Sequence, residues 1–244
     1  MKAKMKTYFH HPGSLVILIL TILSAVITVA ALGSLVVYIL VKGVPHLTPQ
    51  LFEWTYNSDN VSMLPALINT LLLTVLAILI AGPLGIFAAI YMVEYAKKGN
   101  KIVGLVRVTA ETLSGIPSIV YGLFGMLFFC GALHMGYSLI SGALTVAIMV
   151  LPTIMRTSEE ALLAVPKSYR EGSFGLGAGK LRTVFRTVLP SAVPGILSGV
   201  ILSIGRIVGE TAALIFTAGT VAAVPKVNAG VNGFFGSSVR TLSV

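Results

Sequence analysis

The sequence is poor in charge. Only 10% of its 244 residues are Asp, Glu, Lys or Arg, whereas 56% are hydrophobic. A water-soluble domain carries about 25% charged residues, so this composition excludes a protein whose surface faces water throughout. The chain also lacks a linker rich in Ser, Gly, Pro or charge that would divide it into domains. The composition therefore predicts one integral membrane unit.

Metal ligands and cysteine pairs are missing as well. Cys130 is the single cysteine and lies in an apolar run, so a disulfide framework is excluded and the residue is expected to pack as a small apolar side chain. The four histidines show no ligand spacing and are expected at the membrane interface. We therefore expect no metal, no cofactor and no catalytic residues. The histidines are His10, His11, His46 and His134.

Long apolar runs predict five membrane-spanning helices, because about 20 apolar residues cross the hydrocarbon core. The runs are continuous and do not alternate, which excludes a β-barrel. The first is about twice as long as a signal-peptide core and has no A-x-A cleavage site, so it is expected to be retained. We place the helices at residues 12–41, at about 65–93, on either side of 131–138 within 112–155, and at about 190–218.

Glycine and proline predict how these helices pack. Pairs of glycines four residues apart permit close contact between helices. Proline is expected to kink or end a helix. The glycine pairs are Gly195 with Gly199 and Gly205 with Gly209, and the prolines are Pro83, Pro117, Pro152 and Pro194.

The basic residues predict the orientation and exclude a nucleic-acid-binding protein. The chain has 17 Lys and Arg against 8 Asp and Glu, yet no RNA-binding or zinc-finger pattern accompanies this excess. With a cytoplasmic N-terminus, 13 basic residues lie inside. The positive-inside rule favours this orientation. The others are Lys42, Lys226 and Arg240 outside and Arg206 in the membrane.

A polar loop at about 156–189 contains REGSFGLGAGKLRTVFRTVLP. Glu171 is followed by Gly177 after six residues, and by Leu189 and Pro190 after 18 and 19. This register resembles the EAA signature of ABC-importer permeases, although Gly172, Ser173 and Thr187 replace its two alanines and its isoleucine. The resemblance implies a coupling helix, a turn at the glycine and a second helix, which dock on an ATP-binding subunit. A plain solvated basic loop is the alternative.

The same loop resembles a P-loop only superficially. In GLGAGKL, Phe174 stands where the first glycine is required and Leu181 where Ser or Thr is required. The chain is therefore not expected to be an enzyme, and ATP is expected to bind to a separate partner subunit.

Two charges interrupt the apolar stretch SIGRIVGETAALI at 203–215. Arg206 and Glu210 are four residues apart and would share one face of a helix. A charge at the bilayer centre costs about 2.5 to 3.5 kcal/mol, so two explanations are open: an ion pair that fixes packing, or a polar path for an anion. Arg156, in LPTIMRTSEEAL, would add a second guanidinium to such a path. Glu111 is expected to pair with Arg107.

GRIVGETAAL, GIPSIVYGLFG at 115–125 and LPTIMRTSEEAL at 151–162 together resemble the PstA-type permease of phosphate-specific ABC importers. The likeness covers about residues 65–242. It implies an all-α polytopic membrane protein with the MetI-like helix bundle of type I importers, and roles for Arg206, Glu210 and Arg156 in passing phosphate. It also implies a bacterial or archaeal cell membrane, and as partners a second homologous permease, two ATP-binding subunits and an external phosphate-binding protein.

On the same basis, residues 1–64 would hold the tail, the first helix and an external loop, and residues 65–244 a permease core whose sixth, C-terminal helix is missing. We further hypothesise that the Glu210 carboxylate accepts the proton that phosphate keeps near neutral pH and sulfate lacks. Three other classes remain open: a permease for another solute, a proton-driven secondary transporter, and a structural anchor.

Overall fold

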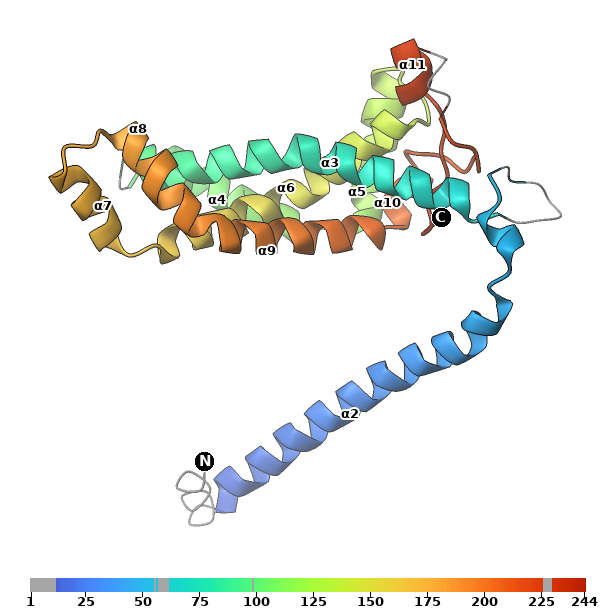
Figure 1. The fold of residues 1–244 in the computed structure, drawn as a ribbon, viewed down its shortest axis with the longest axis horizontal. Coiled ribbons are helices and arrows are strands. Elements are labelled where there is room, and N and C mark those ends of the chain that lie inside the picture. Colours follow the sequence, from blue (N-terminus) through green and yellow to red (C-terminus); the bar gives the residue numbers. More distant parts are fainter. Residues whose placement is uncertain (1–11, 55, 57–61, 98, 226–229) are drawn as a thin grey trace. The chain divides into compact units, whose positions relative to one another are not determined.

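The computed structural model describes residues 12–54, 56, 62–97, 99–225 and 230–244. Within these ranges all regular structure is helical (Figure 1). Four helices are long and apolar enough to cross a membrane, and a bent pair would make a fifth. Some of the basic residues counted for the predicted orientation, and two of the histidines expected at the membrane interface, lie outside the described ranges. They are Lys2, Lys4, Lys6, His10, His11, Lys98 and Lys226.

The chain forms two compact units, residues 1–51 and 52–244. The first contains α2 (Pro12–Gly43), a 32-residue helix that confirms the first predicted span, and the short turn η1 (Val44–His46). The division between the units falls within a second short turn, η2 (Pro49–Phe52). α2 is apolar on all sides, as expected of a helix surrounded by lipid.

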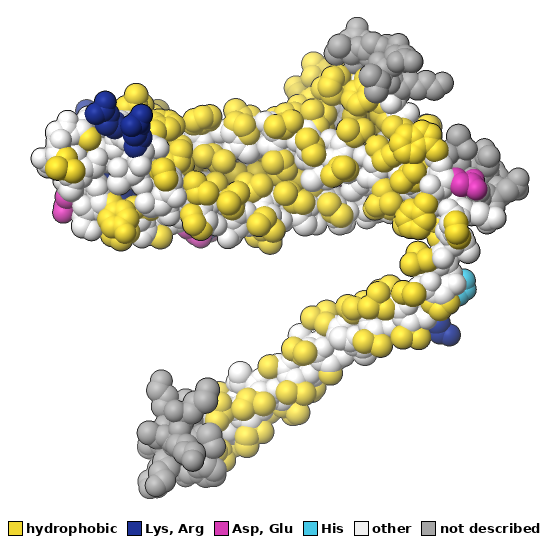
Figure 2. Space-filling model, in the orientation of Figure 1, with side chains coloured by type: hydrophobic (Ala, Val, Ile, Leu, Met, Phe, Trp, Pro, Cys, Tyr) yellow, Lys and Arg dark blue, Asp and Glu magenta, His cyan; other side chains and the backbone are white. Residues whose placement is uncertain are grey.

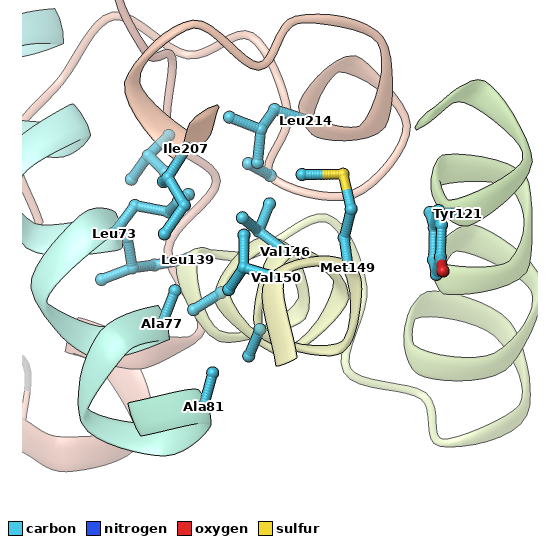
Figure 3. Packing of buried hydrophobic residues seen from close by; sticks show 14 of the residues in the cluster. Leu73, Ala77, Ala81, Tyr121, Leu139, Val146, Met149, Val150, Ile207 and Leu214 are labelled. Atoms are coloured by element: carbon cyan, nitrogen blue, oxygen red, sulfur yellow. The ribbon is translucent and has the colours of Figure 1, made fainter. Parts of the chain in front are cut away.

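The second unit is a helix bundle built around α6 (Leu139–Ala164). α3 (Leu64–Ile90), which continues into the π turn η3 (Tyr91–Tyr95), lies along α6, and α9 (Leu189–Val208) packs against both. Figure 3 shows Val146 and Val150 of α6 facing Leu73 and Ala77 of α3. Hydrophobic side chains cover the flank of the bundle, whereas Lys and Arg gather at the end that carries α7 (Lys167–Gly175) and α8 (Lys180–Thr183) (Figure 2).

Small residues let these helices approach closely. A Cβ added at Gly195 in α9 would lie 2.6 Å from the Cβ of Ala161 in α6, and one at Gly199 would overlap Thr157. This confirms the first predicted glycine pair as a packing contact. At the second pair, a Cβ on Gly205 would meet no atom within 4 Å and one on Gly209 would meet the Gly205 carbonyl (3.6 Å), so this pair brings no other described helix into close contact.

The third predicted span is wrong as a single helix. Residues 101–132 form α4 (Lys101–Ser114), then α5 (Ser118–Gly125) with the π turn η4 (Met126–Ala132), and the two halves meet at 102°. Pro117 precedes α5 and has no N–H to continue α4, which explains the break. Pro83, Pro152 and Pro194 instead lie inside α3, α6 and α9.

Past α9 the chain folds back over the end of the bundle. α10 (Ala212–Ile215) packs against α5. Val239 N–H donates to the Ala218 carbonyl (2.9 Å), and the buried side-chain amide of Asn69 in α3 donates to the carbonyls of Ala223 and Arg240 (3.0 Å each). These hydrogen bonds satisfy backbone N–H and carbonyl groups of the non-helical segments at this end of the bundle. Along the chain, α11 (Gly230–Phe235) lies between Ala223 and Val239.

The contact between α6 and α9 can be tested with two matched glycine substitutions. Gly199→Ala should lower the free energy of unfolding by about 1 to 3 kcal/mol, because the new methyl group overlaps Thr157. Gly104→Ala in α4 meets no atom within 4 Å and should be neutral or slightly stabilising. Thermal unfolding of the detergent-solubilised protein measures both. Equal midpoints for the two variants would contradict this packing.

Candidate functional site

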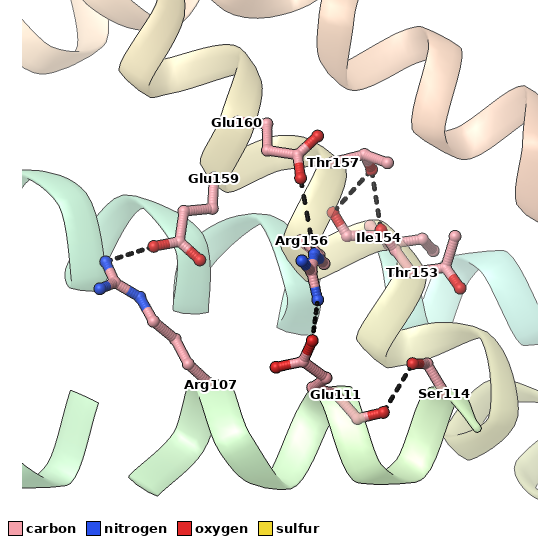
Figure 4. A network of polar contacts seen from close by, with 9 residues as sticks. All are labelled: Arg107, Glu111, Ser114, Thr153, Ile154, Arg156, Thr157, Glu159 and Glu160. Carbon is pink, nitrogen blue, oxygen red and sulfur yellow. Dashed lines mark hydrogen bonds and ion pairs between the residues drawn. The ribbon is translucent and has the colours of Figure 1, made fainter. Parts of the chain in front are cut away.

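Ion pairs join α4 to α6 at one end of the bundle (Figure 4). Arg156 of α6 lies 3.5 Å from a carboxylate oxygen of Glu111 in α4 and 3.5 Å from one of Glu160, one turn further along α6. Arg107 of α4 pairs with Glu159 of α6. A cavity of about 250 Å³ opens between these side chains. The predicted pathway residue Arg156 is therefore already held by two carboxylates.

The predicted pairing of Glu111 with Arg107 is wrong. Both residues lie on α4 four positions apart, but each turns across to α6, where Arg156 and Glu159 offer the opposite charges. Nothing in the sequence of α4 alone indicated this, because it depends on how the two helices lie against each other.

Arg206 and Glu210 do not share a helix face, which corrects the sequence analysis. α9 ends at Val208, and Gly209 follows as its C-cap. The Glu210 backbone N–H donates to the Ile207 carbonyl (3.1 Å), and its buried carboxylate accepts the backbone N–H of Ala213 (3.1 Å). Glu210 thus caps the short helix α10 instead of continuing α9.

The ion pair between Arg206 and Glu210, one of the two explanations left open by the sequence, is not formed. Arg206 is half-buried in the last turn of α9 and makes no hydrogen bond or ion pair with any residue that the structure describes. It lies close enough to Tyr121 of α5 for an electrostatic interaction, while the Tyr121 hydroxyl donates to the Leu113 carbonyl (2.7 Å). The guanidinium donors therefore remain available to a ligand.

The loop between α6 and α9 has the shape that its glycines predict. α7 (Lys167–Gly175) follows Pro166 and ends before Gly177, whose φ of +80° favours glycine. The chain then reverses into α8 (Lys180–Thr183), the π turn η5 (Val184–Val188) and α9, which form one continuous helix. Leu189 and Pro190 begin α9, and Glu171 is exposed on α7.

The exposed part of this loop is unusually apolar. Leu176 at the reversal is 92% exposed, and Tyr169, Phe174 and Leu181 are also exposed. Together with Glu171, we call these residues the loop surface. Exposed apolar side chains rimmed by polar residues are typical of surfaces that bind another protein.

A contact that the sequence patterns did not predict joins α7 to α3 and α6. Arg170 donates from Nε (3.0 Å) and Nη2 (2.7 Å) to Oε1 of Glu94 in η3. It also donates to the carbonyls of Val165 (2.8 Å) and Leu162 (2.9 Å) at the end of α6. A lone carboxylate at the end of a charge-free run, YMVEYA, was the signal in the sequence.

Residues 81–236 match the family described as binding-protein-dependent transport system inner membrane component. The probable ABC transporter permease protein YqgI of Bacillus subtilis is 40% identical over 200 residues, which are 81% of this chain and 67% of that protein. The phosphate transport system permease protein PstA 1 of Mycobacterium tuberculosis is 40% identical over 154 residues, 63% of this chain. The aligned part is half the length of that relative.

Among solved structures, a chain of the inward-facing MetNI methionine ABC transporter superposes with a TM-score of 0.50. The identity is 22%, and the match covers 59% of this chain and 67% of that chain. This likeness confirms the predicted MetI-like helix bundle.

The two arginines of the α4–α6 network give a matched test of its energetics. They are similarly exposed, at 51% for Arg107 and 55% for Arg156. Arg107→Ala should cost about 1 to 3 kcal/mol of unfolding free energy, because it leaves the Glu159 carboxylate, 11% exposed, without its partner. Arg156→Ala should cost less than about 1 kcal/mol, because water can solvate Glu111 and Glu160. Equal losses in thermal unfolding would contradict the assignment.

Proposed function

The chain belongs to the family of binding-protein-dependent transport system inner membrane components, and from this we propose that it forms part of the path by which an ATP-driven importer moves inorganic phosphate into the cytoplasm. A protein of this family is a membrane permease subunit and not itself an enzyme. The solute, the residues along its path and the partner subunits are our proposals.

The choice of solute rests on Arg206, whose half-buried guanidinium has no partner among the residues that the structure describes. Arginine remains charged at any physiological pH, and its planar fork of donors matches the oxygens of phosphate. The side chain stands at the end of an otherwise apolar helix, where an uncompensated charge costs free energy. An anion that binds there removes this cost, which favours an anionic solute over a neutral or cationic one.

Arg156 would act at a second point along the path. Both of its ion pairs are 3.5 Å long and exposed, so Glu111 and Glu160 hold it only weakly. A phosphate that enters the neighbouring cavity would replace the contacts of Arg156 with these carboxylates by contacts with its own oxygens. The relatives named as PstA proteins support phosphate, and the more general name of the Bacillus subtilis relative leaves the solute to be measured.

The partners follow from the loop surface and from the family. The loop surface would dock on one of two ATP-binding subunits, with Glu171 and the Gly177 turn presenting it and Leu189 and Pro190 leading the movement into α9. A second, homologous permease would complete the membrane path, and an external phosphate-binding protein would deliver the solute. We expect the complex in a bacterial or archaeal cell membrane, with the N-terminus of this chain in the cytoplasm.

Arg206→Gln in the assembled complex should abolish phosphate uptake, because the neutral amide loses both the charge and the fork of donors. Arg206→Lys keeps the charge alone and should retain partial uptake. Uptake of labelled phosphate into proteoliposomes is measured, with co-purification of the ATP-binding subunits as the control for assembly. Loss of assembly in Arg206→Gln would instead give Arg206 a structural role.

Glu210 is the third residue that we place on the path, and Glu210→Gln tests it without disturbing the cap of α10. The glutamine side-chain oxygen can still accept the Ala213 N–H, so only the negative charge is lost. Phosphate uptake should fall relative to sulfate, because sulfate has no proton to donate near neutral pH. Both anions are compared at concentrations that saturate the external binding protein. Unchanged rates and unchanged selectivity would remove Glu210 from the path and leave it as a cap.

A further inference from the structure

Helix α7 is attached to α3 and α6 through a polar contact and not through a buried apolar face. None of the described residues of α7 is buried, whereas the Arg170 side chain is 19% exposed and its partner Glu94 is 9% exposed. An apolar contact can slide, but a network of directed hydrogen bonds cannot change geometry without breaking. The position of α7 relative to α3 and α6 is therefore defined by what Arg170 binds.

Arg170 joins three elements at one point. Two of its nitrogens bind the Glu94 carboxylate in η3, and its remaining donors reach the carbonyls of Leu162 and Val165, which end α6. The last carbonyls of a helix have no partner inside that helix, so the guanidinium satisfies groups that would otherwise be orphaned. A movement of α7 must carry the ends of both α3 and α6 with it or leave a shielded carboxylate without its cation.

A second contact reaches the same turn from the other half of the loop. Lys180 at the start of α8 lies over the ring of Tyr95, 5.0 Å from its centroid. Ser173 of α7 and Thr183 of α8 share a hydrogen bond of 2.8 Å, so the two halves are also tied to each other. Glu94 and Tyr95, the partners of Arg170 and Lys180, both lie in η3, a π turn, and such turns often occur at functional sites.

We propose that Arg170 is a positioning residue that transmits movement of α7 to α3 and α6, with Glu94 as its partner. The inference rests on the proposed importer, in which an ATP-binding subunit moves the loop surface. The movement has only a short distance to travel along α6, because the proposed pathway residue Arg156 lies nine residues before Val165, which Arg170 binds. Arg170 touches neither solute nor nucleotide and acts only through the helices that it joins.

The first test is the ratio of phosphate taken up to ATP hydrolysed, measured on the whole complex in proteoliposomes. Arg170→Ala and Glu94→Ala should each lower this ratio on the order of tenfold while ATP hydrolysis continues. The double variant should be no worse than either single one, because both remove the same contact. The exposed Lys97→Ala, three residues from Glu94, is the control for loss of a charge and should retain the wild-type ratio.

A purely structural role gives a different result. Uptake and ATP hydrolysis would then fall in proportion, or the ATP-binding subunits would no longer co-purify, and either outcome overturns the proposal. Should the alanine variants fail to fold, Arg170→Lys and Glu94→Gln keep the size of each side chain. They should show the same loss of ratio to a smaller extent, and an unchanged ratio in both contradicts the proposal.

The second test does not depend on the solute. Cys130, the single cysteine, lies in η4 just before α6 begins, and α6 spans about 39 Å from there to α7. In complexes with cysteine-free partners, ATP should change the alkylation rate of Cys130 in the wild type and not in Arg170→Ala. An equal response in both, or none in either, overturns the proposal. A wild type that shows the Cys130 response but takes up no phosphate refutes the proposed solute alone.

Discussion

A charge among apolar helices costs free energy unless something compensates it, and the polar features of this bundle are arranged by that constraint. Arg170 and Glu94 are shielded and fully paired. The two arginines that join α4 to α6, Arg107 and Arg156, are half exposed, so water shares the compensation of their charges. Arg206 is half-buried and has no partner among the described residues. The charge of Arg170 is thus fully compensated, whereas no described residue compensates that of Arg206. This difference separates a residue that holds the structure from one that we propose binds a ligand.

Close packing of α6 with its neighbours makes these positions definite. Ala77 and Ala81 of α3 and Ala143 and Ala147 of α6 are buried in the shared core, so the two helices approach without large side chains between them. Gly199 does the same where α9 meets α6. Because these contacts fix how the helices are rotated, the charged residues of α6 face α4 and the last turn of α6 faces α7. Small residues thereby determine which charges meet.

The sequence was sufficient for features that depend on one segment at a time. Runs of apolar residues predicted α2, α3 and α6, and a glycine with a required left-handed turn predicted the reversal at Gly177. It failed where two segments must be compared. The partners of Glu111 and Arg107 depend on how α4 lies against α6, and the Arg170 contact joins residues 76 positions apart. The end of α9 was missed because the apolar run continues through Gly209, which was taken for a packing residue.

The end of α9 changes the meaning of Arg206. A cation near a helix C-terminus interacts favourably with the helix dipole, typically by about 0.3 to 1 kcal/mol. Placing an arginine deep in the bilayer costs about 2.5 to 3.5 kcal/mol on insertion scales. The dipole therefore offsets only part of the cost, and Glu210 offsets none through an ion pair, because its carboxylate caps α10. Helix stability alone does not account for Arg206, and the anion contact that we propose would supply the compensation that no described residue gives it.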